Sequence, residues 1–468
     1  MKGFVETPDD VVDLMVNKLF CDCPPSVDST VLDPGCGTGK FVAGIIRWCE
    51  ERGISPPAIT GVELNPRHVE VARARFSAHS TVRIAHRDFL ISHTTTYDYV
   101  VGNPPYVPIT ELQTEEKRRY RMMYSTATGR FDLYLLFFEQ ALRCLKPGGR
   151  LVLITPEKFL YVETAAPLRR LLASKRLEEL LLLQEDVFGE LVTYPTVTML
   201  TNEPRPAQTK VVLRNGKTVH VALSRDGSSW LPVVNGRCPG DDKYKLIDAC
   251  RRVSCGVATG ADSVFVKREF GLDPALRPFA YPTVAGRELT SGSQRLLPMS
   301  RLLIPYTRDG SLLSAGDLGA FGEYLSRPEL RHRLERRTCV ARKPWYAFHE
   351  TPVLDEILRP KILCKDITAE PHFWMDREGT IVPRHSVYYM VPKNPSVIDE
   401  LTDYLNSPAA KEWLWAHCQR ASKGFLRIQS RVLKKLPLPS HLAPVSAETH
   451  EFGSSTARIR LPALLAHR

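Results

Sequence analysis

Residues 31–41 have the sequence VLDPGCGTGKF and lie between a predicted strand and a predicted helix. Asp33 ends the strand, and glycines at alternate positions let the backbone turn so that a ligand can approach the helix N-terminus. The segment is not a P-loop, because Pro34 stands where that motif begins with glycine. It also departs from the dinucleotide fingerprint, because Lys40 takes the place of the third glycine. We therefore predict a cradle for a nucleotide-like ligand that has no pyrophosphate.

The sequence around this loop alternates short apolar runs with amphipathic stretches from Thr30 to Leu200. The apolar runs predict buried strands, and the amphipathic stretches predict helices between them. Such alternation is typical of a parallel sheet with helical crossovers. We predict an α/β fold whose ligand site lies at the carboxyl ends of the strands.

The chain is expected to divide into four parts. Residues 210–223 predict a hairpin that turns at Asn215-Gly216, and the glycine- and proline-bearing stretch after it is typical of a linker. The expected parts are a ligand-binding domain at 1–205, the hairpin and linker at 206–240, a second domain at 241–440 and a flexible tail at 441–468.

The positive charge of the chain lies in its C-terminal part. The 468 residues are 43% hydrophobic and 25% charged, with a net charge of +11. Residues 1–200 hold 23 Lys and Arg against 25 Asp and Glu, whereas the other 268 residues hold 40 against 27. This asymmetry predicts a small-molecule site followed by a nucleic-acid surface. Without a long apolar run or a metal-type cysteine spacing, we expect a cytoplasmic protein with no membrane span and no metal.

Two further acids end the next two predicted strands. The carboxylate of Glu63, in ITGVELNP, can accept hydrogen bonds from both hydroxyls of a ribose. Asp88, in RIAHRDF, can accept from an adenine amino group, and Phe89 can pack against the ring. A single acid at such a place is more often a helix cap or a solvated carboxylate. The order of Asp33, Glu63 and Asp88 along three strands favours a ligand with adenosine in it.

The tetrapeptide Asn103-Pro104-Pro105-Tyr106 follows the fourth predicted strand. The two prolines make a rigid edge. The side-chain oxygen of Asn103 and the carbonyl of Pro104 can each accept one N–H of a planar nitrogen, which exposes its otherwise delocalised lone pair. Tyr106 can then stack on the planar group. The structural alternative is a tight proline turn capped by an asparagine.

With these motifs the chain resembles the adenine-N6 DNA methyltransferases of the gamma class, the TaqI-like enzymes of restriction-modification systems, over residues 4–439. The resemblance implies a class I S-adenosylmethionine-dependent methyltransferase sheet, with S-adenosylmethionine as cofactor. It implies methyl transfer to a flipped-out adenine in duplex DNA. The implied catalytic residues are Asn103, Pro104, Pro105 and Tyr106. The implied cofactor-binding residues are Thr7 (in FVETP, residues 4–8), Asp33, Gly35, Cys36, Gly37, Gly39, Glu63, Asp88 and Phe89.

The C-terminal half resembles the α+β target-recognition domain of this family at residues 257–266, 342–350, 359–367 and 405–439. A second aromatic for the target base is expected at Phe188 or Tyr194, and alignment favours Phe188. The other candidate DNA contacts form two groups. The first is a run of basic residues in a polar loop after the tetrapeptide: Lys117, Arg118, Arg119 and Arg121. The second, in the C-terminal half, interleaves basic residues with aromatics: Arg342, Lys343, Trp345, Tyr346, Lys423, Phe425 and Arg427. A buried aromatic and a solvated charge run are the structural alternatives.

Four other functions are compatible with part of this pattern. An RNA N-methyltransferase or a cytosine-N4 DNA methyltransferase would use the same chemistry, although the latter class more often has serine in place of Asn103. A release-factor glutamine methyltransferase would have a helical domain before the glycine loop and little after the sheet. A DNA-binding subunit with an inactive cofactor fold would have a broken tetrapeptide. We expect a monomer that modifies duplex DNA, with any restriction endonuclease on a separate chain.

Overall fold

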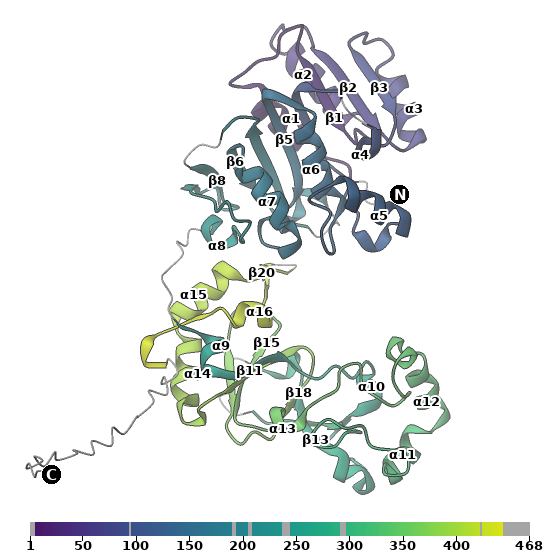
Figure 1. Cartoon of the computed structure of the whole chain (residues 1–468), viewed down its shortest axis with the longest axis vertical. Coiled ribbons are helices and arrows are strands. Elements are labelled where there is room, and N and C mark those ends of the chain that lie inside the picture. The colour runs from purple at the N-terminus through teal and green to yellow at the C-terminus, as the bar shows by residue number, and fades with distance from the viewer. Residues whose placement is uncertain are drawn as a thin grey trace, which may run out of the picture.

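Figure 1 shows a computed structural model of the chain, which describes residues 5–92, 95–189, 193–204, 208–235, 244–290, 296–421 and 424–442. The N-terminal half, coloured purple to teal, forms one lobe, and the green to yellow C-terminal half forms a second lobe. Within the described ranges, no helix is long and apolar enough to cross a membrane.

A nine-stranded sheet forms the first lobe, in the order β3-β2-β1-β4-β5-β7-β6-β8-β9. The five strands from β3 to β5 in this order are parallel, whereas β7 is antiparallel to both of its neighbours. This arrangement confirms the predicted α/β fold with a parallel sheet. The strands are β1 (Thr30–Pro34), β2 (Ala58–Glu63), β3 (Val82–His86), β4 (Tyr97–Gly102), β5 (Leu145–Pro156), β6 (Arg176–Leu182), β7 (Pro195–Thr201), β8 (Thr209–Val212) and β9 (Thr218–Val221).

Helices cover both faces of this sheet. One hydrophobic cluster joins the buried sides of α1, α2 and α3 to the sheet, and a second joins α4, α6 and α7 to the opposite face. Apolar residues therefore line both sides of strands such as β5, which is typical of a parallel sheet. The helices are α1 (Asp9–Phe20), α2 (Lys40–Glu50), α3 (Pro66–Arg75), α4 (Phe89–Ser92), α5 (Thr114–Met123), α6 (Leu133–Arg143), α7 (Ala166–Ala173) and α8 (Leu231–Val234).

The hairpin predicted from Asn215-Gly216 forms from β8 and β9 and extends the large sheet at its edge. Gly216 has a φ of +80°, as this turn requires. Trp230, after the hairpin, is fully buried in the hydrophobic cluster of the first lobe. The limits 1–205, 206–240, 241–440 and 441–468 stay predictions, and residues 241 and 443–468 lie outside the described ranges.

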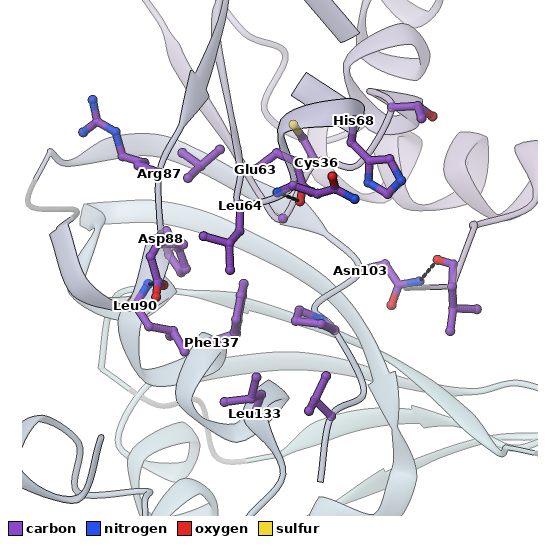
Figure 2. A pocket seen from close by; sticks show the side chains of 18 of the residues that line it. Cys36, Glu63, Leu64, His68, Arg87, Asp88, Leu90, Asn103, Leu133 and Phe137 are labelled. Carbon is purple, nitrogen blue, oxygen red and sulfur yellow. Dashed lines mark hydrogen bonds between the residues drawn. The ribbon is translucent and has the colours of Figure 1, made fainter. Parts of the chain in front are cut away.

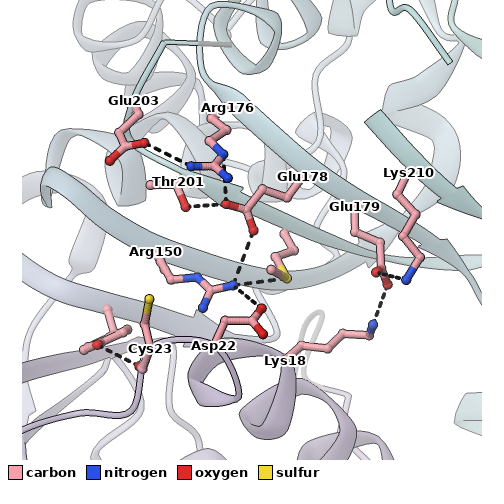
Figure 3. A network of polar contacts seen from close by, with 12 residues as sticks. Lys18, Asp22, Cys23, Arg150, Arg176, Glu178, Glu179, Thr201, Glu203 and Lys210 are labelled. Atoms are coloured by element: carbon pink, nitrogen blue, oxygen red, sulfur yellow. Dashed lines mark hydrogen bonds and ion pairs between the residues drawn. The ribbon is translucent and has the colours of Figure 1, made fainter. Parts of the chain in front are cut away.

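A network of ion pairs fixes α1 to the far strands of the sheet (Figure 3). Lys18 in α1 pairs with Glu179 in β6, which also pairs with Lys210 at 3.0 Å. Burial by itself raises the pKa of Glu179, but the hydrogen bonds from both lysines outweigh it, so that the pKa is lowered. The buried Arg150 contacts Asp22, at the end of α1, at 3.7 Å. The segment in front of α1, residues 5–8, contacts the end of β4, because Asn103 Nδ2 donates to the Val5 carbonyl and to Thr7 Oγ1.

The second lobe contains small antiparallel and mixed sheets. Their orders are β11-β19-β15-β17, β12-β14-β13-β18, β16-β21-β20 and β10-β22. Its strands are β10 (Tyr244–Lys245), β11 (Cys250–Cys255), β12 (Val266–Arg268), β13 (Ala280–Val284), β14 (Ser300–Leu303), β15 (Lys361–Lys365), β16 (Ile367–Thr368), β17 (Phe373–Asp376), β18 (Val382–Pro383), β19 (Val387–Pro392), β20 (Gln419–Arg420), β21 (Leu426–Arg427) and β22 (Pro437–Leu438). Its helices are α9 (Leu246–Ala249), α10 (Asp262–Phe265), α11 (Gly319–Leu325), α12 (Pro328–Glu335), α13 (Leu354–Ile357), α14 (Ile398–Asn406), α15 (Pro408–His417) and α16 (Ser430–Leu433).

Candidate active site

The glycine loop turns between β1 and α2 as its sequence predicts. Gly35, Gly37 and Gly39 have φ values of +80°, +55° and +86°, which side chains other than glycine rarely adopt. A Cβ on Gly39 would lie 2.3 Å from the Phe76 ring. The loop is therefore closed tightly against α3, and a substituted residue would not fit at position 39.

Glu63, at the end of β2, holds this loop in place. Its Oε2 accepts a hydrogen bond from the backbone N–H of Gly37 at 2.9 Å, and its Oε1 accepts one from Asn65 at 2.7 Å. Each carboxylate oxygen has a second lone pair that can accept from a ligand. Glu63 is thus both a support of the glycine loop and part of the wall of the cavity that the loop borders.

A cavity of about 340 Å³ lies at the carboxyl ends of β1 to β4. Figure 2 shows Glu63, Asp88 and Asn103 around one space, with Phe137 and Leu133 on its other side. The predicted cofactor residues that line the cavity are Thr7, Gly35, Cys36, Glu63, Asp88 and Phe89. Asp33, Gly37 and Gly39 shape the loop without lining the cavity. Burial raises the pKa of the Asp88 carboxyl, although a backbone hydrogen bond from Leu90 partly offsets the effect.

The segment before α1 closes the cavity on the side of Asn103. Val5, Glu6 and Thr7 line the cavity. Lys40 of α2 forms an ion pair with Glu6 in this segment at 3.8 Å and with Asp9, the first residue of α1, at 2.9 Å. Phe4, the first residue of the FVETP motif, lies outside the described residues. The described residues of the motif that come before Pro8 therefore form part of the cavity wall.

Asp33 is fully buried, and within the described ranges neither of its carboxylate oxygens has a hydrogen-bond partner. Burial and the nearby charge of Glu63 raise the pKa of Asp33 well above its ordinary value of 3.8. A Cβ on Gly102, just before Asn103, would lie 3.0 Å from Asp33 Oδ1. Within the described ranges, the cavity wall at Gly35 therefore lies next to a buried carboxyl group that has no hydrogen-bond partner.

We expect the substitution Asp33→Asn to raise the free energy of unfolding of the ligand-free protein by about 1–3 kcal/mol, because it removes an unpaired buried charge. Because the pKa of Asp33 is raised in the folded protein, the gain in the free energy of unfolding should be absent at a pH below the ordinary pKa of 3.8. It should grow as the pH rises from the ordinary pKa toward the folded pKa of Asp33, and it should stay constant above the folded pKa. Denaturant unfolding of both proteins across this pH range measures the effect.

The matched control for Asp33 is Asp98, whose carboxylate accepts from Thr30 at 2.8 Å and from Lys146 at 2.9 Å. Burial by itself raises the pKa of Asp98, but these hydrogen bonds lower it. Asp98→Asn should therefore reduce stability at neutral pH and lose this effect as the pH falls through the folded pKa. The same sign of change for both substitutions would contradict the account of Asp33.

Asn103 is oriented by the segment that closes the cavity. Its side-chain Nδ2 donates to the Val5 carbonyl at 3.1 Å and to Thr7 Oγ1 at 3.1 Å. Because a carbonyl can only accept, the nitrogen must face Val5, and the oxygen must face the other way. Asn103 Oδ1 is buried and has no partner among the described residues. The side chain therefore presents an uncommitted acceptor at a fixed position.

The tetrapeptide forms a wall between two cavities. Asn103 and Pro105 line the cavity described above, Pro104 is buried, and Tyr106 lines a second cavity of about 290 Å³. Burial raises the pKa of the Tyr106 phenol. The second cavity, called here the tetrapeptide pocket, is lined by Tyr106, Pro108, Asp132, Tyr134, Pro156, Glu157, Lys158, Tyr161, Thr193, Tyr194 and Arg420.

Of the two candidate aromatics, Tyr194 lines this pocket and Phe188 lies behind the Tyr106 ring without lining it. The Phe188 ring lies 6.2 Å from the Tyr106 ring at an angle of 77°, but Phe188 does not line the tetrapeptide pocket. Tyr194 lines it, and the Tyr194 hydroxyl donates to the Ala421 carbonyl at 3.2 Å. The choice between Phe188 and Tyr194 as a contact of the target base stays a prediction.

The basic residues after the tetrapeptide lie on a helix, so the predicted polar loop is wrong. Lys117, Arg118, Arg119 and Arg121 belong to α5. Glu116 accepts a hydrogen bond from the Gln113 backbone N–H at 2.7 Å, which supports the start of the helix. Tyr120 is the buried residue of α5 and lines the cavity beside the glycine loop, while Arg118 is exposed. The helix thus covers the cavity with one side and presents cations with the other.

The interleaved residues of the second lobe are not one surface. Lys343 Nζ donates to the carbonyls of Phe348 and His349 at 3.2 and 2.9 Å, so it supports its own loop. The Tyr346 ring is buried, and its hydroxyl donates to Leu313. Arg342 and Arg427 are exposed, and Phe425 is partly exposed. Lys423 lies outside the described residues. The expectation of surface aromatics is therefore wrong for Tyr346.

The motifs did not single out several residues that the fold brings to the two cavities. His68, Arg87 and Tyr120 line the first, and Asp132, Lys158 and Arg420 line the second. The fragment FDLYLLF, which begins at Phe131 and contains Asp132, also resembles a later motif of the same methyltransferase family, so Asp132 had a signal in the sequence. Arg420 lies in the 405–439 fragment that resembles the target-recognition domain, but nothing in the sequence placed it at a cavity of the first lobe.

Two family descriptions match parts of the chain. Residues 58–188 match the Eco57I restriction-modification methylase family, and residues 322–438 match the TaqI-like C-terminal specificity domain. The first range contains Glu63, Asp88 and the tetrapeptide. The second contains Arg342, Lys343 and Arg420.

The chain is also similar to whole proteins of known function. It is 26% identical to the Type II methyltransferase M.PaeR7I of Pseudomonas aeruginosa. The alignment covers 94% of this chain and 86% of that protein. It is 25% identical to the Type II methyltransferase M.BstVI of Geobacillus stearothermophilus. This alignment covers 94% of this chain and 90% of that protein. The solved structure of the Type IIL restriction-modification enzyme MmeI in complex with DNA has a TM-score of 0.63 at 12% identity, covering 92% of this chain and 63% of that chain. The fold of both lobes is therefore shared with that structure.

Proposed function

Because the chain joins an Eco57I-type restriction-modification methylase domain to a TaqI-like C-terminal specificity domain, we propose that it methylates N6 of an adenine at a specific site in duplex DNA. Its fold is that of a class I S-adenosylmethionine-dependent methyltransferase, as the sequence predicts, and its methyl donor is S-adenosylmethionine. It is a DNA methyltransferase of the Type II restriction-modification kind. We propose three further points: that the methylated base is adenine, that the methyl group goes to its N6 atom, and that the base leaves the double helix for the reaction.

The position of the Asn103 side-chain oxygen carries this proposal. The adenine N6 lone pair is delocalised into the ring, so the nitrogen is a poor nucleophile until its N–H groups are drawn out of the plane. Asn103 Oδ1 is buried, fixed and without a partner in the described ranges, and it can accept one of these N–H groups. The Pro104 carbonyl is proposed to accept the other. Acceptors fixed before the reaction need no reorganisation when charge develops on the nitrogen.

The tetrapeptide pocket is the proposed place of the target base. The base must leave the double helix to reach it, which costs a few kcal/mol of stacking and pairing energy. Stacking on an aromatic ring contributes about 1–3 kcal/mol per base. Tyr106 lines the pocket beside the wall that holds Asn103, so a base on this ring would have its amino group close to the amide oxygen.

The cavity beside the glycine loop is the proposed site of S-adenosylmethionine, which supplies an electrophilic methyl group when bound. Glu63 is proposed to accept from the ribose hydroxyls, Asp88 from the adenine amino group, and Phe89 to pack on the adenine ring. Asp33 supplies negative charge beneath the loop, and Thr7 covers the cavity from the N-terminal segment. The unpaired Asp33 carboxylate supports this assignment, because the cofactor is a cation.

We expect Glu63→Ala to weaken binding of S-adenosylmethionine by about 1.5–3 kcal/mol, because hydrogen bonds to a charged acceptor are lost. Isothermal titration calorimetry on the folded variant measures this. Glu63→Gln keeps one carbonyl-type acceptor for the glycine loop and should lose less. Glu70→Ala, on the exposed side of α3, is the matched control and should bind normally. Unchanged affinity in a folded Glu63→Ala protein would remove the ribose assignment.

The specificity domain is proposed to bind DNA through its positive charge. Residues after position 200 carry the excess of Lys and Arg, and each phosphate contact releases counterions, so binding should weaken steeply with salt. A restriction endonuclease acting on the same site is the proposed partner in the cell.

The base and the atom are tested by base-resolved sequencing of DNA from cells that produce the protein. Methylated adenine at one recurring sequence is the expected result. Methylation of cytosine N4 would show that the target base is cytosine and not adenine. Methylation of RNA alone would show that DNA is not the substrate. The same experiment gives the recognition site that the following experiments need.

A further inference from the structure

The tetrapeptide pocket is not built by the methylase lobe alone. Arg420 lies in β20 of the second lobe and lines the pocket together with Tyr106, Glu157 and Lys158 of the first lobe. These residues are separated by more than 250 positions in the sequence. The pocket is therefore completed by the part of the chain that matches the specificity domain.

The hairpin that carries Arg420 is fixed to the methylase lobe. The Tyr194 hydroxyl donates to the Ala421 carbonyl at 3.2 Å and accepts from the Gly424 backbone N–H at 3.0 Å. The Arg214 guanidinium lies over the Tyr194 ring at 4.7 Å. Nearby, Asn235 donates to the Ala416 carbonyl in α15 at 3.3 Å. These contacts hold β20 at the rim of the pocket.

Arg420 is a cation of this pocket that has no ion pair among the described residues, although the charge of Glu157 acts on it through space. Glu157 is buried and forms an ion pair with Arg214, and the charge of Asp132 faces that of Lys158. The Arg420 guanidinium stacks on the Trp415 ring at 4.2 Å. In the part of the chain that the structure describes, it makes no hydrogen bond and no ion pair. Burial and the nearby Arg214 lower the pKa of Arg420, and Glu157 partly offsets this effect. The guanidinium stays charged at neutral pH, because arginine is not deprotonated in proteins.

We propose that Arg420 binds the phosphate of the extruded target nucleotide, so that the specificity domain holds the nucleotide in the pocket of the methylase domain. This inference rests on the proposed function. A nucleotide brings one negative charge into the pocket, and its backbone follows the base toward the rim. A planar guanidinium with free N–H groups can bind a phosphate through two parallel hydrogen bonds. The stack on Trp415 leaves the edge of the guanidinium, which carries the N–H groups, available for this contact.

The arrangement also connects recognition with extrusion. Tyr194 holds the hairpin, and the hairpin holds Arg420, so the position of the specificity domain on DNA sets the position of the phosphate contact. Tyr194 then acts through its hydroxyl as a positioning residue, in addition to any contact of its ring with the base.

The test uses the full-length protein and a duplex that contains the methylated site found by sequencing. We expect Arg420→Gln to lower kcat/KM by about tenfold or more, and Arg420→Lys to lose less because it keeps the charge. The slope of log affinity against log salt concentration should decrease by about one for Arg420→Gln, since one phosphate contact is lost. Tyr194→Phe should act in the same direction with a smaller effect.

A second substrate separates binding of the nucleotide from a general structural effect. In this duplex the target adenine is mispaired, so that extrusion costs less. The loss caused by Arg420→Gln should become smaller on the mispaired duplex. Arg251→Gln, on β11 and outside the pocket, is the matched control and should keep the activity of the wild-type protein on both duplexes, because Arg251 is exposed and pairs with Glu356 of the same lobe.

The outcomes are distinct. If the wild-type protein methylates no site in duplex DNA, the proposed function fails. If the wild-type protein is active and Arg420→Gln equals it, the inference about Arg420 fails while the function stands. A loss of activity with an unchanged salt slope and no recovery on the mispaired duplex would assign Arg420 a structural role and also overturn the inference.

Discussion

Replacing Asn103 with alanine is expected to lower the rate of methyl transfer in a single turnover by about 100-fold or more, the scale of removing one preorganised hydrogen-bonding group. The alanine variant lacks the buried oxygen that accepts the N–H of the target nitrogen. The bound nitrogen would then keep its delocalised lone pair and react slowly. Affinity for the cofactor should change much less than the rate, because the acceptor acts on the other substrate. Rapid-quench measurements with excess enzyme give the rate, and calorimetry gives the affinity.

The control for Asn103 must reproduce the loss of its structural hydrogen bonds. Asn202 is such a residue, because its Nδ2 donates to the carbonyls of Leu145 and Lys146 at 2.8 and 3.2 Å, away from both cavities. Asn202→Ala should lower the free energy of unfolding through a similar loss of hydrogen bonds, and it should transfer the methyl group at the wild-type rate. Thr7→Val removes one partner of the Asn103 nitrogen and leaves the oxygen in place, so it should have a smaller effect than Asn103→Ala. Near wild-type single-turnover transfer by Asn103→Ala would contradict the proposed role.

The second large effect is expected at Gly35, where an arginine should abolish detectable binding of S-adenosylmethionine. The residue has a φ of +80°, and it lines the cavity beside the glycine loop. A Cβ at this position would lie 3.6 Å from Phe137 and 3.9 Å from Pro105, so a long side chain would enter the cavity or displace its wall. Its positive charge would also repel a cationic cofactor. Calorimetric titration measures the loss.

Gly53 provides the matched control for the strained backbone. It has a φ of +63° at the end of α2, and a Cβ there would meet nothing within 4 Å. Gly53→Arg imposes the same kind of backbone strain, roughly 1–2 kcal/mol, without entering a cavity. Binding should therefore survive in Gly53→Arg and fail in Gly35→Arg. Loss of binding in both variants would show that strain, rather than the cavity, explains the effect.

The sequence predicted the parts of the site that depend on single strand ends. Asp33, Glu63, Asp88 and Asn103 each follow or end a strand, and parallel strands bring such positions to one edge. The glycine loop was predictable for the same reason. The partners of these residues were harder to predict, because the bond from Glu63 to the Gly37 backbone and the bond from Asn103 to Val5 join segments far apart in the chain.

Two errors of the sequence analysis have identifiable physical causes. The charged run at Lys117 is predicted as a polar loop, but one buried residue, Tyr120, and the contact of Glu116 with the Gln113 backbone support a helix there. Aromatics between basic residues were assigned to a surface, but Tyr346 is buried in the core of the second lobe. Composition does not indicate which side of such a segment faces the solvent. The contact of Arg420 with the methylase lobe depends on the tertiary arrangement alone.

The central claim is that this protein transfers a methyl group to N6 of adenine in duplex DNA with the help of Asn103. The most direct test is to incubate duplex DNA containing the site with S-adenosylmethionine labelled in its methyl group, digest the DNA to nucleosides and identify the labelled product by mass spectrometry. The account predicts labelled N6-methyldeoxyadenosine with the wild-type protein and a product formed at least about 100-fold more slowly with Asn103→Ala. Labelled methylcytosine, or equal rates of product formation by the two proteins, would contradict it.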